Sequence, residues 1–382
     1  MIQRSKPKRV ALVASHAPSL ILFRRSLIEA IGGLGHEVLA LAPDFSADLA
    51  RELEAIGATP LEFPLSRTGL NPFSDLAALR ALTRLFRAHR PDVVTGYTPK
   101  PSIYASLAAA RAGVPRIVPM VTGLGYAFLD GGGLKARILR AVTERLYARA
   151  FAASHAAIFH NADDRAVLAE AGCIPPGLPT RVVSGSGVDL ERFQEQPLPP
   201  PGRGMTFLMI ARLVRYKGIA EYCAAAAAVK AKAPTARFLL AGPEETGPAG
   251  YSLSELRKVA TAVTYLGQVE DVRPLLAEAH VYVLPSYGEG MPRTVLEALA
   301  TGRPVITTDA RGCRETVENG ENGLLVPPRD ATALAEAMAA MLKRPDRLAA
   351  MARASRRLAE QRFDARKVNA AMLSALGLSG GE

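Results

Sequence analysis

The sequence predicts an α/β protein built from two doubly wound parallel sheets. Its 382 residues exceed what one hydrophobic core usually supports, so two domains are expected. Short apolar runs alternate with longer helical patterns along the whole chain, which is the pattern of repeated βαβ units. A segment dense in proline and glycine, EQPLPPPGRGM at 195–205, interrupts this alternation. We therefore place the junction between the two halves near residue 200.

The first half begins with an apolar run, RVALVAS, that follows a basic start. A secretory signal begins in a similar way, but this run is short and ends at His16 and Pro18, so a buried strand is the better interpretation. We expect strands at 9–15, 37–42, 92–96, 116–121 and 156–160, and helices at 24–35, 75–89, 102–112 and 134–153.

The second half restarts the alternation after the proline-rich segment. We expect its strands at 206–210, 237–241, 263–266, 281–285 and 304–307. The final segment, 347–376, has the pattern of an amphipathic helix, and we expect it to return to the first half. The predicted domains are therefore 1–195 and 196–360, with a closing helix at 361–382.

The formal net charge of +11 suits nucleic acid, an anionic membrane surface or anionic substrates. Nucleic acid is not the expected partner, because zinc-finger spacing and RNP-like strands are absent, tryptophan is missing and aromatic residues make up only 6%. No run of eighteen apolar residues predicts a membrane-spanning helix. The three cysteines are odd in number and far apart, which favours a reduced, cytoplasmic setting without disulfides.

Several residues with binding chemistry follow the strands of the second half. In open α/β sheets, ligands bind beyond the carboxyl ends of the strands. Arg212 and Lys217 follow the strand at 206–210 and offer a planar fork and a point cation to a diphosphate, although two solvated loop cations would look the same. Gly242 ends the next strand and Gly267 a later one, and we expect both to let a ligand approach the backbone.

The turn YGEGMP, at 287–292, precedes a helix that should begin near Arg293. A helix N-terminus exposes unpaired backbone N–H groups, which suit an anion or sugar hydroxyls. Glu289 lies in the turn and Glu297 on the helix, and two carboxylates suit the hydroxyls of a sugar and a ribose. Alternatively, Glu289 caps the helix and Glu297 pairs with a cation.

The motifs ARLVRYKG, LLAGPEE, YLGQVEDV and SYGEGMPRTVLEALATGRPVI, in this order, resemble those of the retaining glycosyltransferases of family 4. The similarity reaches back through GSGVDLERF and covers essentially the whole chain, but it is stronger in the second half. It implies the GT-B architecture, in which two Rossmann-like domains face an interdomain cleft. It also implies an enzyme that transfers a hexose or N-acetylhexosamine from a nucleotide-sugar, with UDP as the favoured carrier.

The resemblance implies a role for each matching residue. Arg212 and Lys217 would neutralise the leaving diphosphate, Glu289 would hold hydroxyls of the transferred sugar, and Glu297 would bind the ribose. Transfer would occur on the front side, with retention. Neither a metal nor another cofactor is expected, because no Asp-x-Asp follows a buried strand and the six histidines form no ligand cluster. The remaining donor-binding candidates are Gly242, Gly267, Gln268, Val269, Gly290, Met291 and Pro292.

The first half would then hold the acceptor, and here the chain departs from many relatives. SHAPSLILFRRSLIEA replaces paired glycines after the first strand, and Arg24 could approach a phosphate or simply begin a solvated helix. TGLGYAF, at 122–128, stands where many relatives carry a histidine, and it resembles the subgroup that extends polyprenyl-diphosphate-linked sugars, such as N-acetylgalactosaminyltransferases. The acceptor-side candidates are Arg24, Lys100, Thr122, Gly123 and Gly125.

The segment 134–149 combines an apolar stripe with basic residues and has two interpretations. A basic amphipathic helix can lie on an anionic membrane, and the protein would then be peripheral on the inner face. An ordinary domain helix would pack the same stripe against the sheet. The stripe consists of Leu134, Ile138, Leu139, Val142 and Leu146, and the basic residues are Lys135, Arg137, Arg140, Arg145 and Arg149.

Three other functions were weighed against transfer. An NAD-dependent oxidoreductase is disfavoured, because Phe128 stands at the third glycine position of GLGYAF and no acid ends a strand about twenty residues later. A GT-B-shaped epimerase that cleaves UDP-sugars would share the fold and the nucleotide site. A non-enzymatic basic scaffold at the membrane would leave the residues at the strand ends unexplained.

Overall fold

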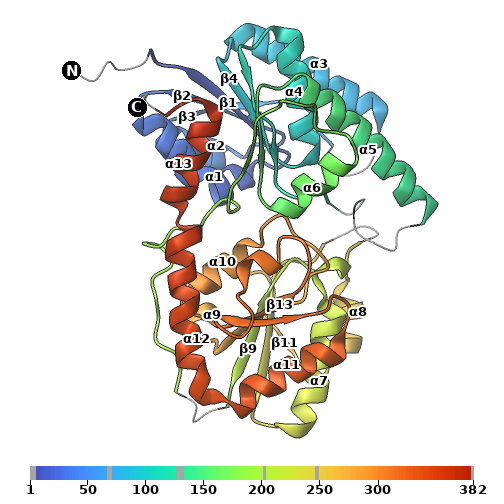
Figure 1. Ribbon diagram of the computed structural model, residues 1–382, viewed down its shortest axis with the longest axis vertical. Helices are drawn as coiled ribbons and strands as arrows, with labels where there is room; N and C mark the ends of the chain where they lie inside the picture. Colours follow the sequence, from blue (N-terminus) through green and yellow to red (C-terminus); the bar gives the residue numbers. More distant parts are fainter. Residues whose placement is uncertain are drawn as a thin grey trace. The chain divides into compact units, whose positions relative to one another are not determined.

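The computed structural model describes residues 6–66, 71–125, 128, 133–200, 204–245 and 249–379. The chain divides into two compact units. Unit 1 comprises Met1–Ser186 and Ala365–Glu382, and unit 2 comprises Gly187–Asp364. Each unit has its own parallel sheet with helices around it, as Figure 1 shows, so the predicted α/β class is confirmed.

The main sheet of unit 1 has the strand order β3-β2-β1-β4-β5, and all its pairs are parallel. Its central strand β1 alternates its side chains between two cores, with Val10 and Leu12 on one face and Ala11 and Val13 on the other. A second sheet has the order β6-β7-β8. The strands are β1 (Arg9–Val13), β2 (Glu37–Ala42), β3 (Ala58–Glu62), β4 (Val93–Gly96), β5 (Arg116–Ile117), β6 (Met120–Val121), β7 (Ala157–Phe159) and β8 (Thr180–Val182).

The helices of unit 1 cover both faces of its main sheet. Helix α4 packs against α3 and α5 over one core, and α1 packs against α13 over the other. Proline stands in the first turn of α1, α3 and α4, where its missing N–H costs nothing. The helices are α1 (Pro18–Gly33), α2 (Ala47–Ala55), α3 (Pro72–His89), α4 (Pro99–Ala112), α5 (Leu134–Ala152), α6 (Ala162–Glu170) and α13 (Ala365–Leu376).

Unit 2 has one parallel sheet of order β11-β10-β9-β12-β13-β14. The order reverses at β9, whose neighbours are β10 and β12, and in open α/β sheets ligands bind beyond the carboxyl ends of the strands at such a switch point. The strands are β9 (Thr206–Ile210), β10 (Arg237–Ala241), β11 (Thr264–Tyr265), β12 (Val281–Leu284), β13 (Val305–Thr308) and β14 (Gly323–Val326). The helices are α7 (Ile219–Lys232), α8 (Leu253–Val259), α9 (Arg273–Glu278), α10 (Arg293–Ala300), α11 (Ala331–Lys343) and α12 (Pro345–Leu358), with 3₁₀ turns at Arg215–Lys217 and Arg314–Thr316.

The proline-rich segment belongs to unit 2 and is not a linker between the units. The division falls after Ser186, before the predicted junction at 195/196. The fully buried Arg303 explains the difference, because its Nη2 donates to the carbonyl oxygens of Gln196 at 2.5 Å and Pro197 at 3.0 Å. A buried guanidinium needs such acceptors, and they fasten the segment to unit 2.

Two predicted elements are interrupted. The strand expected at 116–121 changes partner at Pro119, so that β5 pairs with β4 and β6 pairs with β7. The helix expected at 347–376 is divided into α12, a π-helical turn at Ala359–Phe363, and α13. Helix α13 belongs to unit 1, where Val368, Met372 and Leu376 are buried in the core beside α1.

Candidate active site

The loop after β9 and the loop after β12 are fastened together in unit 2. Gly218 has φ +75, and a Cβ atom at this position would lie 2.1 Å from the carbonyl oxygen of Pro285. Only glycine fits such an approach in the left-handed region. Tyr287 N also donates to Tyr216 O at 2.9 Å. These contacts hold Lys217 beside the turn that carries Glu289.

Lys217 and Glu289 form an ion pair at the centre of this arrangement. Lys217 Nζ lies 2.5 Å from Glu289 Oε1, and the two side chains are only 16% and 13% exposed. The backbone of the turn is fixed from a third loop, because Glu289 N donates to Arg311 O at 2.9 Å. A Cβ atom on Gly312, with φ +70, would lie 2.3 Å from Glu289 O. The glycine-rich turn therefore presents Glu289 to Lys217 at a fixed place.

Arg212, the second predicted cation, contacts a different carboxylate. Its Nη1 donates to Glu245 Oε2 at 2.6 Å, and its Nη2 donates to Tyr216 OH at 3.3 Å. Burial works to lower the pKa of Arg212, but Tyr216, Glu245 and Glu289 together raise it. Arg212 is thus within electrostatic reach of Glu289, and each of the two cations carries a carboxylate partner.

The predicted glycines serve contacts between the protein's own loops. Gly242 has φ +142, and a Cβ atom there would lie 1.9 Å from the carbonyl oxygen of Ala211. Gly242 N donates to Gly267 O at 2.8 Å, and Tyr265 OH donates to Gly242 O at 2.7 Å. The close approach at Gly242 is therefore to the loop after β9, whereas the sequence had suggested a ligand. Gln268 is exposed, and Val269 is half-buried against the core.

Helix α10 begins at Arg293, as predicted, with Pro292 at its N-cap position. Glu297 is 8% exposed and accepts a hydrogen bond from Arg293 Nε at 2.9 Å. Burial raises the pKa of Glu297 despite the opposing effect of this arginine. The structure thus shows the alternative in which Glu297 pairs with a cation. Gly290 and Pro292 are buried, and Met291 is half-buried.

Arg212 and Lys217 can bind an anion if it displaces the carboxylates that they now contact. A diphosphate offers oxygens that can replace the carboxylates now bound to Arg212 and Lys217. The displaced carboxylates can then accept hydrogen bonds from hydroxyl groups. Sequence reasoning missed Glu245 and Tyr216, because their pairing with Arg212 depends on the fold and not on a motif of its own.

Arg24 of unit 1 lies in a buried polar cluster and does not begin a solvated helix. It is 2% exposed, its guanidinium lies 4.7 Å from the centre of the Tyr97 ring, and its Nη2 lies 3.4 Å from His160 Nε2. Burial and the Arg24 charge hold the pKa of His160 well below its ordinary value. Tyr97, His160 and Met372, which Arg24 contacts, all belong to unit 1, and the approach of Arg24 to an acceptor phosphate stays a prediction.

Lys100 likewise forms its contacts with other residues of unit 1. Its Nζ lies 2.8 Å from Asp75 Oδ1 and donates to Ser66 O at 3.0 Å. Tyr104 OH donates to the other oxygen of Asp75 at 2.9 Å. These bonds fasten α3 to α4. They give Lys100 a structural role that requires no bound acceptor.

The loop after β6 contains the other acceptor-side candidates. Thr122 Oγ1 accepts a hydrogen bond from Thr98 N at 3.2 Å. Gly123 and Gly125 have φ values of +131 and +77, so this loop uses the conformational freedom of glycine. Part of the TGLGYAF motif, at 126–127, lies outside the described residues.

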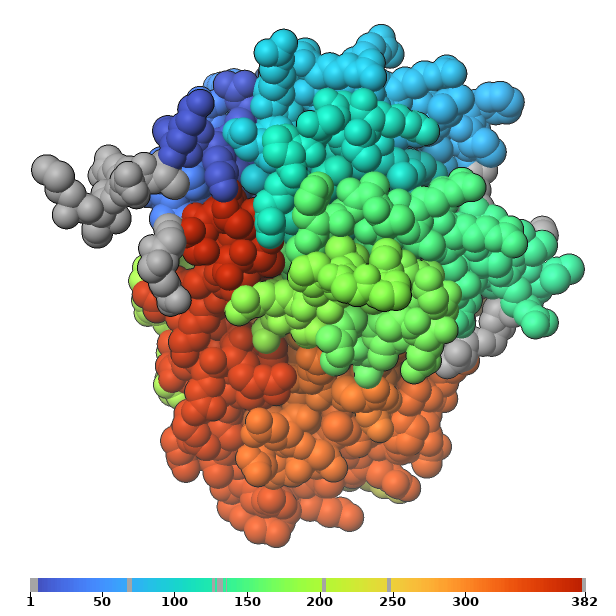
Figure 2. Space-filling view, turned by 45° about the horizontal axis from the view of Figure 1, so that its top comes forward, coloured from blue at the N-terminus to red at the C-terminus, as the bar shows by residue number. Residues whose placement is uncertain are grey.

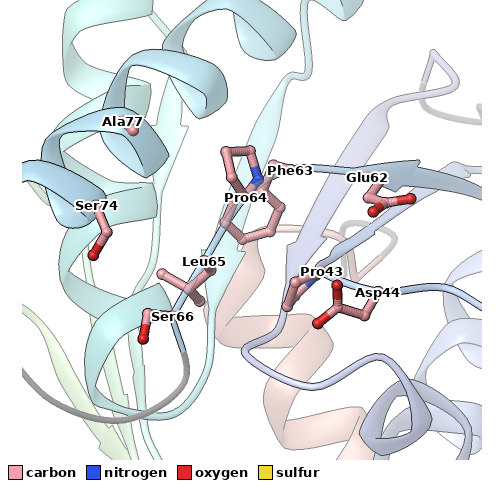
Figure 3. A pocket seen from close by; sticks show the side chains of 9 residues that line it. All are labelled: Pro43, Asp44, Glu62, Phe63, Pro64, Leu65, Ser66, Ser74 and Ala77. Carbon is pink, nitrogen blue, oxygen red and sulfur yellow. The ribbon is translucent and has the colours of Figure 1, made fainter.

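Unit 1 has a cavity of about 500 Å³ near the carboxyl ends of β2 and β3, which the sequence did not reveal. Figure 3 shows the residues that line it, drawn from these strand ends and from α3. They are Pro43, Asp44, Glu62, Phe63, Pro64, Leu65, Ser66, Ser74 and Ala77.

Within the described ranges, no group of three or more His, Cys, Asp or Glu side chains is placed to hold a metal ion. Independence from metal stays a prediction. In the same part of the chain, no helix combines the length and the apolar character needed to cross a membrane.

Comparison with known proteins identifies the enzyme class. Residues 204–344 match the family described as glycosyl transferases group 1, and residues 23–172 match the glycosyl transferase 4-like domain. Each half of the chain thus matches a glycosyltransferase domain. The predicted enzyme class is therefore confirmed.

Two relatives carry informative names. This glycosyltransferase is 29% identical over 346 residues to the N,N'-diacetylbacillosaminyl-diphospho-undecaprenol alpha-1,3-N-acetylgalactosaminyltransferase of Campylobacter jejuni, covering 88% of this chain and 89% of the relative. It is 27% identical to the UDP-Gal:alpha-D-GlcNAc-diphosphoundecaprenol alpha-1,3-galactosyltransferase of Escherichia coli, covering 69% of this chain and 70% of the relative.

Solved structures share the fold. Sucrose-phosphate synthase from Thermosynechococcus elongatus has a TM-score of 0.79 at 19% identity and covers 96% of this chain and 98% of its own. Anabaena HepE in complex with UDP and glucose has a TM-score of 0.77 at 19% identity and covers 97% of this chain and 99% of its own. The predicted GT-B fold class is confirmed.

Proposed function

We propose that this glycosyltransferase moves a hexose or N-acetylhexosamine from a UDP-linked donor to a polyprenyl-diphosphate-linked sugar, in cell-surface polysaccharide or glycan biosynthesis. The observation that carries the proposal is the largely buried Lys217–Glu289 pair, 2.5 Å apart, with Arg212 within electrostatic reach. One set of side chains thus combines cations for a diphosphate with a carboxylate for sugar hydroxyls. The names of the two relatives support the donor class and the acceptor class.

In the proposed reaction, Arg212 and Lys217 hold the donor diphosphate. The bond between the sugar's anomeric carbon and the phosphate oxygen breaks, and negative charge grows on the leaving diphosphate. Fixed cations act most strongly on charge that develops in the transition state, and one such group contributes roughly 2.7–4 kcal/mol. The bond from the acceptor oxygen forms on the same face of the sugar, and the acceptor proton passes to the departing phosphate oxygen.

Two carboxylates position the donor in this scheme. Glu289, released from Lys217 by the diphosphate, accepts hydrogen bonds from the hydroxyls of the transferred sugar. Glu297 accepts from the ribose hydroxyls. Because Glu297 is 8% exposed and its pKa is raised, a hydroxyl donor adds a hydrogen bond to a carboxylate that has only limited contact with water. The buried Gly290 and Pro292, with Met291, complete the wall beside the sugar.

The acceptor class determines where the enzyme works. A polyprenyl chain resides in a bilayer, so its diphosphate-linked sugar is reached at the membrane surface. We therefore place the enzyme on the inner face of the membrane as a peripheral protein that uses a cytoplasmic nucleotide-sugar.

The test is a transfer assay with a panel of UDP-sugars and short-chain polyprenyl-diphosphate sugars. Product mass and the anomeric configuration of the new linkage are measured. We expect transfer from one UDP-sugar or sugar family with retained configuration, and its loss in Lys217→Ala. An inverted linkage, or an epimerised UDP-sugar formed without acceptor, would overturn the proposal.

A further inference from the structure

Helix α5 exposes the apolar residues of its N-terminal half. Leu134, Ile138 and Val142 are 72%, 55% and 36% exposed, and their spacing of four residues places them in one stripe along the helix. The opposite side contributes Tyr147 and Phe151 to the unit 1 core. The interpretation that the whole apolar stripe packs on the sheet is therefore wrong for three of its members, whereas Leu139 and Leu146 are half-buried.

The same stripe becomes cationic toward the C-terminal end of α5. Arg145 and Arg149 continue the series at helical spacing, and both are exposed. Arg137 and Arg140 are exposed beside it. The one acid of α5, Glu144, is 23% exposed and pairs with Arg140 at 2.8 Å. The exposed face therefore has an apolar end and a basic end.

Helix α5 lies at the periphery of unit 1. In Figure 1, α5 runs beside α4, and its N-terminal end extends away from the sheet of unit 1. In Figure 2, the green side chains of this region form a protruding edge of unit 1.

We propose that α5 docks on an anionic lipid bilayer, with Leu134, Ile138 and Val142 entering the boundary of the acyl region and Arg145 and Arg149 among the lipid phosphates. Charge complementarity selects this occupant, because an exposed face with four arginines, on a chain of net charge +11, favours anionic headgroups. The apolar end distinguishes the α5 face from a nucleic-acid-binding surface, because exposed leucine and isoleucine side chains would gain no burial against a phosphate backbone. The purpose of docking rests on the proposed function, but its evidence lies in α5 alone.

The test measures co-sedimentation of the full chain with vesicles of phosphatidylcholine alone or mixed with phosphatidylglycerol. One variant, Ile138→Gln with Val142→Gln, changes the apolar end, and another, Arg145→Gln with Arg149→Gln, changes the basic end. The control, Arg257→Gln with Val259→Gln, alters exposed residues of unit 2, where Val259 is 37% exposed and so matches Val142.

We expect the wild type and the control to bind the mixed vesicles and not phosphatidylcholine alone. Each α5 variant should bind at least about tenfold more weakly, since one basic residue near an anionic surface alters partitioning by roughly fivefold. Failure of the wild type to bind mixed vesicles, or equal binding by all variants, would overturn docking. Lipid-independent dimerisation that Ile138→Gln with Val142→Gln abolishes would assign the stripe to a second copy instead.

Transfer assays separate this inference from the proposed function. With a short-chain, water-soluble acceptor, the α5 variants should keep the kcat and KM of the wild type. With a long-chain acceptor in vesicles, their apparent KM should rise. Vesicle binding without any transfer would contradict the proposed function but support docking. Transfer without vesicle binding would contradict docking but support the proposed function.

Discussion

Lys217 and Glu289 are mutually dependent because both side chains are largely withdrawn from water. Removing one partner deprives the other, a partly buried charge, of the oppositely charged group beside it, which costs about 1–3 kcal/mol of stability. We expect Lys217→Ala and Glu289→Ala to fold with reduced stability and to lose transfer by roughly 10²- to 10³-fold in kcat.

A double variant separates stability from catalysis at this pair. Lys217→Met with Glu289→Gln removes both charges, so urea denaturation should show stability above that of either single variant, while transfer stays lost. Arg273→Ala, which breaks the exposed pair with Asp271, is the control and should leave the rate unchanged. Normal transfer by Lys217→Ala or Glu289→Ala would refute the assignment.

We expect Glu245 to compete with the donor diphosphate for Arg212. The pair is partly exposed, at 40% for Arg212 and 27% for Glu245, so its net strength is modest. Glu245→Gln should therefore tighten UDP binding by about two- to fivefold, as measured by titration calorimetry. Glu255→Gln, which removes a carboxylate from Arg215 in the same unit, is the matched control. Unchanged or weaker binding in Glu245→Gln alone would show that Glu245 does not compete.

Glu297 should make stability depend on pH in an uncommon direction. Burial raises its pKa above the ordinary value of 4.5, so the native state holds the proton more tightly than the unfolded chain. Its contribution is fully present below that ordinary value and is lost as pH rises through the raised pKa. Relative to Glu297→Gln, the wild type should lose stability as urea denaturation is repeated from about pH 4.5 upward.

Glu255 is the contrasting case for the same experiment. Hydrogen bonds from Ser252 and Arg215 lower its pKa to about 2. Its contribution is therefore present above the ordinary value and is lost as pH falls toward 2, so Glu255→Gln should show the opposite trend. The same pH trend in both variants would contradict the burial argument for Glu297.

At the scale of elements, loop contacts at the strand ends position the site. Gly218→Ala places a Cβ atom against Pro285 O at φ +75, whereas Gly267→Ala has the same φ of +75 and nothing within 4 Å. Both substitutions strain the backbone by about 1–2 kcal/mol, and only Gly218→Ala adds about 1–3 kcal/mol of overpacking. Thermal unfolding should rank them in this order, and transfer should fall more in Gly218→Ala. Equal loss of stability would show that the contact with Pro285 is unimportant.

The sequence predicted the elements that local patterns determine. The bounds of β2, β9 and β10 agree with expectation, because these strands are apolar runs bounded by turns or breaks. Strand β3, ATPLE, was missed because its polar and proline residues suit an edge strand and carry no clear alternation. The change of sheet at Pro119 and the break before α13 depend on packing between distant segments, which local periodicity does not report.

The candidate site also combines features that local sequence predicts with contacts that depend on packing between distant segments. Arg212, Lys217 and Glu289 could be placed together, because parallel strands bring their carboxyl ends to one edge. Glu245 could not be assigned to Arg212, since that contact joins two different loops. The same limit applied to Lys100, whose bond to Asp75 depends on how α3 packs against α4.

At the scale of the whole molecule, two sheets of similar doubly wound order share one polypeptide. The cations and carboxylates of unit 2 form the candidate donor site, and unit 1 contributes the cavity near β2 and β3 together with the exposed face of α5. Motifs therefore predicted which strand-end residues of unit 2 lie together, but not the surroundings of the acceptor-side candidates in unit 1. The acceptor-side residues at Arg24 and Lys100 are bound to neighbours that only the fold reveals.

Metal independence is a prediction for the intact enzyme. In our scheme, Arg212 and Lys217 supply the positive charge that a divalent ion supplies in other phosphate-releasing enzymes. Excess EDTA should therefore leave the transfer rate unchanged. A rate that disappears in EDTA and returns only with Mg²⁺ or Mn²⁺ would contradict this scheme.

Unit 2 should bind a UDP-sugar through Lys217 and its neighbours, and a thermal-shift panel measures this binding. UDP, UDP-sugars and NAD are added to the wild type and to Lys217→Ala. A ligand at a hundred times its Kd stabilises the folded state by about 2.7 kcal/mol. We predict that UDP and one UDP-sugar family raise the Tm of the wild type, and that Lys217→Ala loses most of this shift. Stabilisation by NAD alone, or an equal UDP shift in both proteins, would contradict the account.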